Sequence, residues 1–152
     1  MSSLRARPER VAVCALVLAL AACGGSGSAT LTKEQYASKL SRLCLVAADQ
    51  LRELHVDNGV AAWRADGPKI VAIERRFNRK LAALKPPESI QDAVVAYTKA
   101  NDRGFRATED AVAAAKSGDA QKLQAALQQA NKDNLATGAP AKTIGATGCY
   151  IG

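Results

Sequence analysis

Histidine is the commonest general base in enzymes, and this chain of 152 residues contains one, His55. On the helix predicted before Asp57, His55 lies away from the apolar stripe, which favours a solvated histidine near a helix C-terminus over a catalytic base. Di-iron bundles use paired Glu-x-x-His motifs, and the run Glu53-Leu54-His55 has a different spacing. Glycine-rich phosphate loops, Gly-x-Ser-x-Gly and His-Glu-x-x-His are absent from the sequence. We therefore predict a non-enzymatic protein with no metal site and no cofactor.

The first 23 residues have the three parts of a cleaved export signal: basic residues, an apolar run and small residues before a cysteine. The apolar run, residues 11–22, is too short to span a bilayer core, which needs about 20 residues. It ends in Leu20-Ala21-Ala22-Cys23, which resembles the lipobox of bacterial lipoproteins, whose cysteine thiol accepts diacylglycerol. A plain secretory signal with an incidental cysteine, or an uncleaved anchor, is the alternative.

This signal predicts the organisation of the chain. Residues 1–22 form a signal peptide, residues 23–31 contain the lipidated Cys23 and a flexible Gly/Ser tether, and residues 32–152 form the folded domain. Acyl chains such as palmitate on Cys23 would hold the protein to the outer face of the cytoplasmic membrane.

Two cysteines remain in the exported domain, Cys44 and Cys149. Exported domains commonly oxidise such a pair, so we predict a structural disulfide between the first helix and the tail after the last one. A redox thiol or a zinc site is the alternative. A redox site would favour a Cys-x-x-Cys pair, and zinc would require further Cys or His ligands, which the sequence does not supply.

Apolar residues recur every three or four positions along most of the domain, which indicates amphipathic helices. Thr32 and Gln35 predict a capping box at the start of the first helix. A short helix is predicted over 60–65, and a second long helix begins near Pro68, a tolerated first-turn position. The predicted helix breaks are Asp57-Asn58-Gly59, Pro86-Pro87, Ser117-Gly118-Asp119 and Gly138-Ala139-Pro140.

Almost no segment alternates with the period of a β-strand, and aromatic residues make up only 4% of the chain. Long amphipathic helices joined by short loops are typical of bundles. We therefore predict an all-α fold, an antiparallel up-down-up-down four-helix bundle with one disulfide.

Two asparagines occupy positions where the helical stripes would place leucine, Asn101 and Asn134. Counted outward from Ser117-Gly118, they fall at the same level of adjacent antiparallel helices, so we predict that they hydrogen-bond each other. Such a layer would fix the register of the bundle. The alternative is the polar wall of a cavity for a small or lipidic ligand between these helices, with Tyr97 supplying a hydroxyl.

The chain is basic, with a formal net charge of +7. Arg75, Arg76, Arg79 and Lys80 place several cations along one side of a helix. We expect this group to form an ordinary solvated face, partly balanced by Glu74. Because an exported protein meets little nucleic acid, the alternative partners of this face are anionic lipid head groups or wall polymers.

Three short motifs of the mature chain resemble a loose group of small lipoproteins of high-GC actinobacteria. They are the Thr-Lys-Glu-x-Tyr start at residues 32–36 with Cys44, the Leu-Lys-Pro-Pro-Glu junction at residues 84–88, and the Gly-x-x-x-Cys tail at residues 145–149. The resemblance implies a helical fold, a disulfide and an envelope location, and it implies no activity. Together these observations predict a lipid-anchored domain that acts through protein or envelope contacts, or alternatively a ligand carrier or sensor.

Overall fold

The computed structural model describes residues 30–54, 56–57 and 59–150. Within these residues every regular element is helical and no strand occurs, so the predicted all-α fold class is confirmed. The elements in chain order are α1 (Lys33–Arg52), α2 (Val60–Ala82), the 3₁₀ helix η1 (Glu88–Ile90), α3 (Gln91–Ser117), α4 (Ala120–Ala136), α5 (Gly138–Ile144) and the 3₁₀ helix η2 (Thr147–Cys149).

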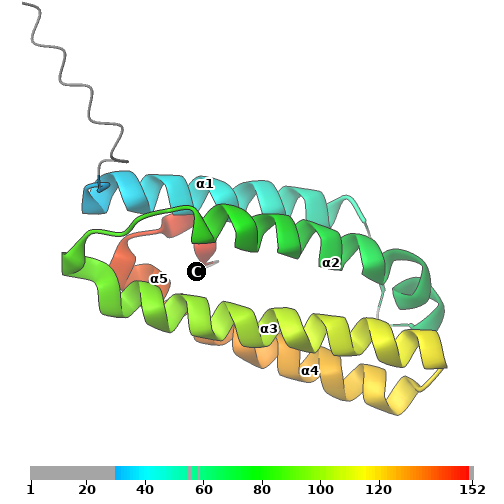
Figure 1. Ribbon diagram of the computed structural model, residues 1–152. Coiled ribbons are helices and arrows are strands. Elements are labelled where there is room, and N and C mark those ends of the chain that lie inside the picture. Colours follow the sequence, from blue (N-terminus) through cyan, green and yellow to red (C-terminus); the bar gives the residue numbers. More distant parts are fainter. Residues whose placement is uncertain (1–29, 55, 58, 151–152) are drawn as a thin grey trace, which may run out of the picture.

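The helices pack in neighbouring pairs (Figure 1): α1 on α2, α2 on α3, and α3 on α4. The short helix α5 packs on α3, and η2 returns the chain to α1. None of the helices described has both the length and the apolar composition needed to cross a bilayer.

The predicted capping box begins α1. The Thr32 hydroxyl accepts a hydrogen bond from the Gln35 backbone N–H at 3.2 Å, and the Thr32 backbone N–H donates to the Gln35 side chain at 3.0 Å. Two N–H groups that lack intrahelical partners are thereby satisfied. The following apolar residues Tyr36 and Leu40 are fully buried, so core packing begins within the first turns after the cap.

The prediction of a separate short helix before Pro68 is wrong, because α2 is continuous through that residue. Proline inside a helix costs about 3 kcal/mol. Trp63 and Ile70 lie on either side of it and both are buried, and burial of two such side chains gains roughly 2 to 3 kcal/mol each. The free energy gained by burying these side chains therefore exceeds the cost of a proline inside the helix. Gly67 permits the close contact, since a Cβ there would come within 2.7 Å of Val112 on α3.

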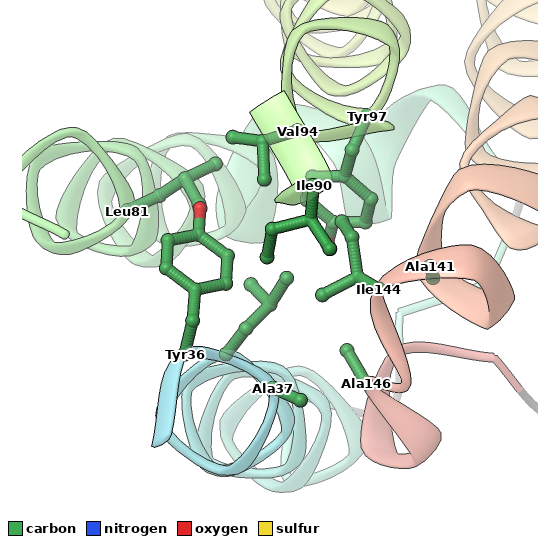
Figure 2. Packing of buried hydrophobic residues seen from close by; sticks show 10 residues of the cluster. Tyr36, Ala37, Leu81, Ile90, Val94, Tyr97, Ala141, Ile144 and Ala146 are labelled. Carbon is green, nitrogen blue, oxygen red and sulfur yellow. The ribbon is translucent and has the colours of Figure 1, made fainter. Parts of the chain in front are cut away.

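The buried apolar residues form two clusters. The Tyr36 cluster (Figure 2) joins α1, the end of α2, the start of α3, and α5. Its buried members are Tyr36, Ala37, Leu40, Leu81, Ile90, Val94, Tyr97, Ala141, Ile144 and Ala146. The Trp63 cluster joins α2, the alanine-rich second half of α3, and α4; its buried members are Trp63, Ile70, Ala111, Val112, Ala114, Ala115 and Leu123.

The helix is interrupted at Thr137, between α4 and α5, one residue before the Gly138-Ala139-Pro140 run that was predicted to break it; those three residues begin α5. Gly145 then ends α5 in the left-handed conformation, with φ of 90°. Gly148 packs so closely on α1 that a Cβ would meet the Ser41 carbonyl oxygen at 2.5 Å. These two glycines bring the tail back to α1, and the first of them ends the helix where only a residue without a Cβ is unstrained.

Cys44 and Cys149 lie at disulfide-bonding distance, with their Cα atoms 5.1 Å apart. The pair links α1 to η2 and closes a loop of 105 residues. The predicted pairing is therefore the one found.

Candidate binding sites

Tyr97 lies beside this sulfur pair. Its hydroxyl is 3.3 Å from Sγ of Cys44 and, because a disulfide sulfur carries no proton, the hydroxyl is the donor. Burial raises the pKa of Tyr97, and the nearby Tyr36 adds to the shift. Tyr97 is therefore a neutral donor inside the Tyr36 cluster.

Asn101 does not pair with Asn134. Its side-chain Nδ2 donates instead to Oδ1 of Asn78 on α2, at 2.7 Å. Asn134 is exposed and lies against Gly104 of α3, where a Cβ would come within 2.7 Å of its Oδ1. The predicted amide layer between α3 and α4 is thus replaced by an amide pair between α2 and α3.

The turn between α3 and α4 explains this difference. The residues outside both helices are Gly118, which has a left-handed conformation, and Asp119, whose side chain caps α4 by accepting from the Lys122 N–H. The prediction centred the turn one residue earlier, between Ser117 and Gly118. Moving the centre of the turn by one residue changes which residue of α4 faces a given residue of α3. The change is two positions along α4, which is more than half a helical turn.

A partly buried ion pair between Arg103 and Asp133 joins α3 to α4 next to Asn134. Asp133 is only 5% exposed, and its carboxylate accepts from Nε of Arg103 at 2.8 Å and from Nε2 of Gln129 at 2.6 Å. The hydrogen bond from Gln129, followed by that from Arg103, lowers the pKa of Asp133. This arrangement crosslinks the two helices and leaves both carboxylate oxygens satisfied.

An open groove of about 630 Å³ runs between α2 and α3; we call it the α2–α3 groove. Apolar side chains form much of its lining: Tyr36, Leu81, Leu84, Val94, Val95 and Phe105. Three cations also line it, Arg75, Arg79 and Lys99, against one acidic residue, Asp102. Arg75 forms an ion pair with Glu109 at 3.0 Å, and its guanidinium carbon lies 6.0 Å from the centre of the Phe105 ring.

This groove divides the basic group that the sequence indicated. Arg75 and Arg79 line it, whereas Arg76 and Lys80 do not, because residues one apart on a helix face different directions. Lys99 joins them from α3. An apolar surface with a cationic rim fits a molecule that has an apolar chain and an anionic group.

A second cavity of about 500 Å³ lies between α2, α3 and α4; we call it the Glu74 cavity. Leu51, Trp63, Ile70 and Leu127 supply apolar walls, and Gln124, Gln128, Asn131 and Asn134 supply amides from α4. Glu74 is the one ionisable residue among the described residues that line it. Asn134, one of the two asparagines considered for a ligand cavity, lines this one. The sequence placed that cavity between α3 and α4 and did not include α2 in its wall.

Glu74 is poorly satisfied in this cavity. The Thr108 hydroxyl is 3.4 Å from its Oε1 but also 3.1 Å from the Gly104 carbonyl oxygen, and one proton must serve both. Among the described residues, Oε2 of Glu74 and the buried indole Nε1 of Trp63 have no hydrogen-bond partner. Burial raises the pKa of Glu74 to about 7, and the charge of Glu109 adds to the shift while Thr108 opposes it.

Sequence reasoning missed Glu74 because it divided α2 at Pro68. In the continuous helix, one face carries residues at spacings of four, three and four: Trp63, Gly67, Ile70 and Glu74. A carboxylate on an otherwise apolar helix face is unusual, because charged side chains are rarely buried, and it indicates a binding site. This spacing can be recognised only if the helix is assumed to continue through Pro68.

The lipidation residue Cys23 and the histidine His55 lie outside the described residues, so both predictions about them stay predictions. Within the described residues, no group of three or more His, Cys, Asp or Glu side chains gathers as metal ligands would. Comparisons with models of protein families, with curated proteins and with solved structures each return no match for this chain.

Proposed function

We propose that this chain is a lipid-anchored, non-enzymatic domain of the bacterial cell envelope that binds an anionic amphiphile in its α2–α3 groove. The observation that carries the proposal is the combination of an apolar lining with three cations in one groove. The acyl chain would lie along Leu81, Val94 and Val95, and the anionic group would meet Arg79 and Lys99.

The magnitudes favour an amphiphile over a purely apolar ligand. Burial of about eight CH₂ groups would contribute roughly 6 kcal/mol. Association costs about 4 to 15 kcal/mol in lost translational and rotational freedom. The apolar lining alone is therefore a weak binder, and the cations supply both the additional affinity and the preference for an anion.

The position of the groove fits a domain tethered at Cys23. Tyr36, in the first turn of α1, lines the groove, so one end of it lies beside the point where the tether begins. The nine residues from Cys23 to Thr32 can span at most about 30 Å. A groove this close to the bilayer can receive lipid from it, or contact the head groups directly.

The proposal includes the antiparallel up-down-up-down order of the four long helices. The two-residue connection between α3 and α4 and the packing of each helix on its predecessor support that order. In such a bundle the α2–α3 groove runs along the helices, as an extended acyl chain requires.

Metabolic labelling with a fatty acid tests the anchor. We expect Cys23→Ala to abolish labelling and membrane retention, whereas Cys14→Ala, in the part of the signal that is removed, leaves both intact. A Cys23→Ala protein that still carries fatty acid would refute the lipid anchor.

Native mass spectrometry of the membrane-extracted protein tests the groove. We expect a retained anionic amphiphile that is lost in Val95→Glu, because Val95 is 41% exposed and lines the groove. The matched control is Leu135→Glu, at a residue that is 73% exposed and lies outside the groove. Equal retention by both variants, or an envelope protein in place of the amphiphile, would contradict this proposal.

A further inference from the structure

The Glu74 cavity combines a buried carboxylate with apolar and amide walls. A buried carboxylate without a full set of hydrogen-bond donors costs several kcal/mol of desolvation. Such groups are usually paired with a cation from the protein. Here the described lining residues include no Lys or Arg, and Arg75, the next residue along α2, pairs with Glu109 instead.

We propose that the Glu74 cavity binds a small organic ammonium ion, and that the Glu74 carboxylate, whose Oε2 is closed to solvent and unpartnered in this structure, rotates to accept from the ammonium N–H. The ligand's apolar part would contact Ile70 and Leu127, and the Trp63 indole would offer its face to the cation. This site is separate from the α2–α3 groove and does not depend on acylation of the chain.

Charge explains why an ammonium ion suits this cavity better than an anion or a neutral molecule. The α3 neighbours of Glu74 are Glu109, which disfavours its ionised form, and the neutral Thr108. The lining residues from α4 are neutral, and Leu51 from α1 is apolar. An anion would meet a carboxylate with no compensating cation, whereas an ammonium ion would supply the missing donors and the opposite charge.

A cation bound at the Glu74 carboxylate would also favour its ionised form. Bound ammonium should therefore move the pKa of Glu74 down from about 7 toward its ordinary value of 4.5. In return, ammonium binding should weaken as the pH falls below 7, because protonation of Glu74 removes the negative charge that the ligand needs.

The single tryptophan of the chain, Trp63, lines this cavity and reports on it directly. The experiment titrates the purified full protein in zwitterionic lipid vesicles at pH 8 with benzylammonium and with n-butylammonium, following Trp63 fluorescence. Benzyl alcohol serves as the neutral probe of similar shape, and benzoate as the anion. We expect saturable binding of at least one ammonium probe, at least about tenfold tighter than either control compound.

Two carboxylate variants complete the test. Glu74→Gln should weaken ammonium binding by about tenfold or more at pH 8 and remove its dependence on pH. Glu109→Gln, which changes a neighbouring carboxylate outside the lining, should keep the preference for ammonium. Absence of a saturable response to either ammonium probe, equal affinity for benzyl alcohol, or unchanged binding in Glu74→Gln would each overturn the proposal.

Discussion

The Tyr36 cluster and the Trp63 cluster differ in the size of their side chains and in how well their polar atoms are hydrogen-bonded. The Tyr36 cluster contains large side chains such as Tyr36, Leu40 and Ile144. The Tyr97 hydroxyl in it donates to Cys44, and the sulfur pair lies beside it. The Trp63 cluster relies on alanines of α3 and borders a cavity in which a carboxylate oxygen and an indole N–H lack partners. The covalent crosslink therefore lies at the Tyr36 end of the bundle, and the unpartnered buried polar atoms lie at the Trp63 end.

A belt of polar contacts separates the two clusters. It includes the Asn78–Asn101 pair between α2 and α3 and the Arg103–Asp133 ion pair between α3 and α4. Buried polar groups of this kind restrict the register of neighbouring helices because a slip would leave them unpaired. Asn101 can therefore serve the register function expected of it through Asn78 in place of Asn134.

Removing the sulfur pair should have the largest effect on the Tyr36 cluster. The double variant Cys44→Ala/Cys149→Ala should lose about 3 to 4 kcal/mol of unfolding free energy, since the crosslink closes a loop of 105 residues. Urea unfolding with and without reductant measures this loss. Reduced wild type should resemble the double variant, and a wild type indifferent to reductant would contradict the stabilising role.

The next largest effect is the pH dependence set by Glu74. Its folded-state pKa of about 7 exceeds the ordinary value of 4.5, so the unfolded chain releases this proton first as the pH rises. The resulting stability is fully present below pH 4.5, is lost between 4.5 and about 7, and is constant above that range. The loss amounts to about 3 kcal/mol. Glu74→Gln should remove it, which thermal unfolding across this pH range measures.

Asp133→Asn is the matched control for the Glu74 measurement. The pKa of Asp133 is lowered below 3.8, so its contribution is present above that value and is lost only as the pH falls further. The substitution should therefore lower stability without changing the slope between pH 4.5 and 7. A wild-type stability that is flat across that range would contradict the burial of an ionisable Glu74.

The smallest effect concerns the polar belt. Asn101→Ala should cost about 1 to 2 kcal/mol, because it leaves the Asn78 amide without its partner. A double-mutant cycle between Asn78 and Asn101 should give a coupling of roughly 1 kcal/mol, measured by urea unfolding. Asn134→Ala should change stability by less than about 0.5 kcal/mol, since Asn134 is exposed. Equal costs for Asn101→Ala and Asn134→Ala would favour the register predicted from the sequence.

Local signals were sufficient for much of the fold. Three such signals depend on residues within a few positions of each other: the capping box of Thr32, the non-helical segment at Pro86-Pro87, and the interruption at Thr137 just before Gly138-Ala139-Pro140. Such signals act through backbone geometry and hydrogen bonds that are complete within one turn. The pairing of Cys44 with Cys149 followed from the small number of cysteines in the predicted folded domain, residues 32–152.

The candidate sites depended on contacts that no local pattern contains. Pro68 signals a helix start by its own chemistry, and only the burial of Trp63 and Ile70 against α3 and α4 keeps α2 continuous. Glu74 is an ordinary glutamate in the sequence, and it becomes largely buried because residues of α1, α3 and α4 pack around this part of α2. The sequence could therefore predict which segments are helical but not which side chains would line a cavity.

The sequence by itself determined an all-α domain with defined helix ends and a cysteine pair, because helical periodicity, caps and turn residues are properties of short segments. Tertiary structure alone decided that Asn101 bonds to Asn78, that Asn134 faces solvent, and that Glu74 is buried. Those outcomes depend on the centre of one turn and on the packing of distant helices. A shift of a single residue in that turn is enough to change the partner of a side chain on the facing helix.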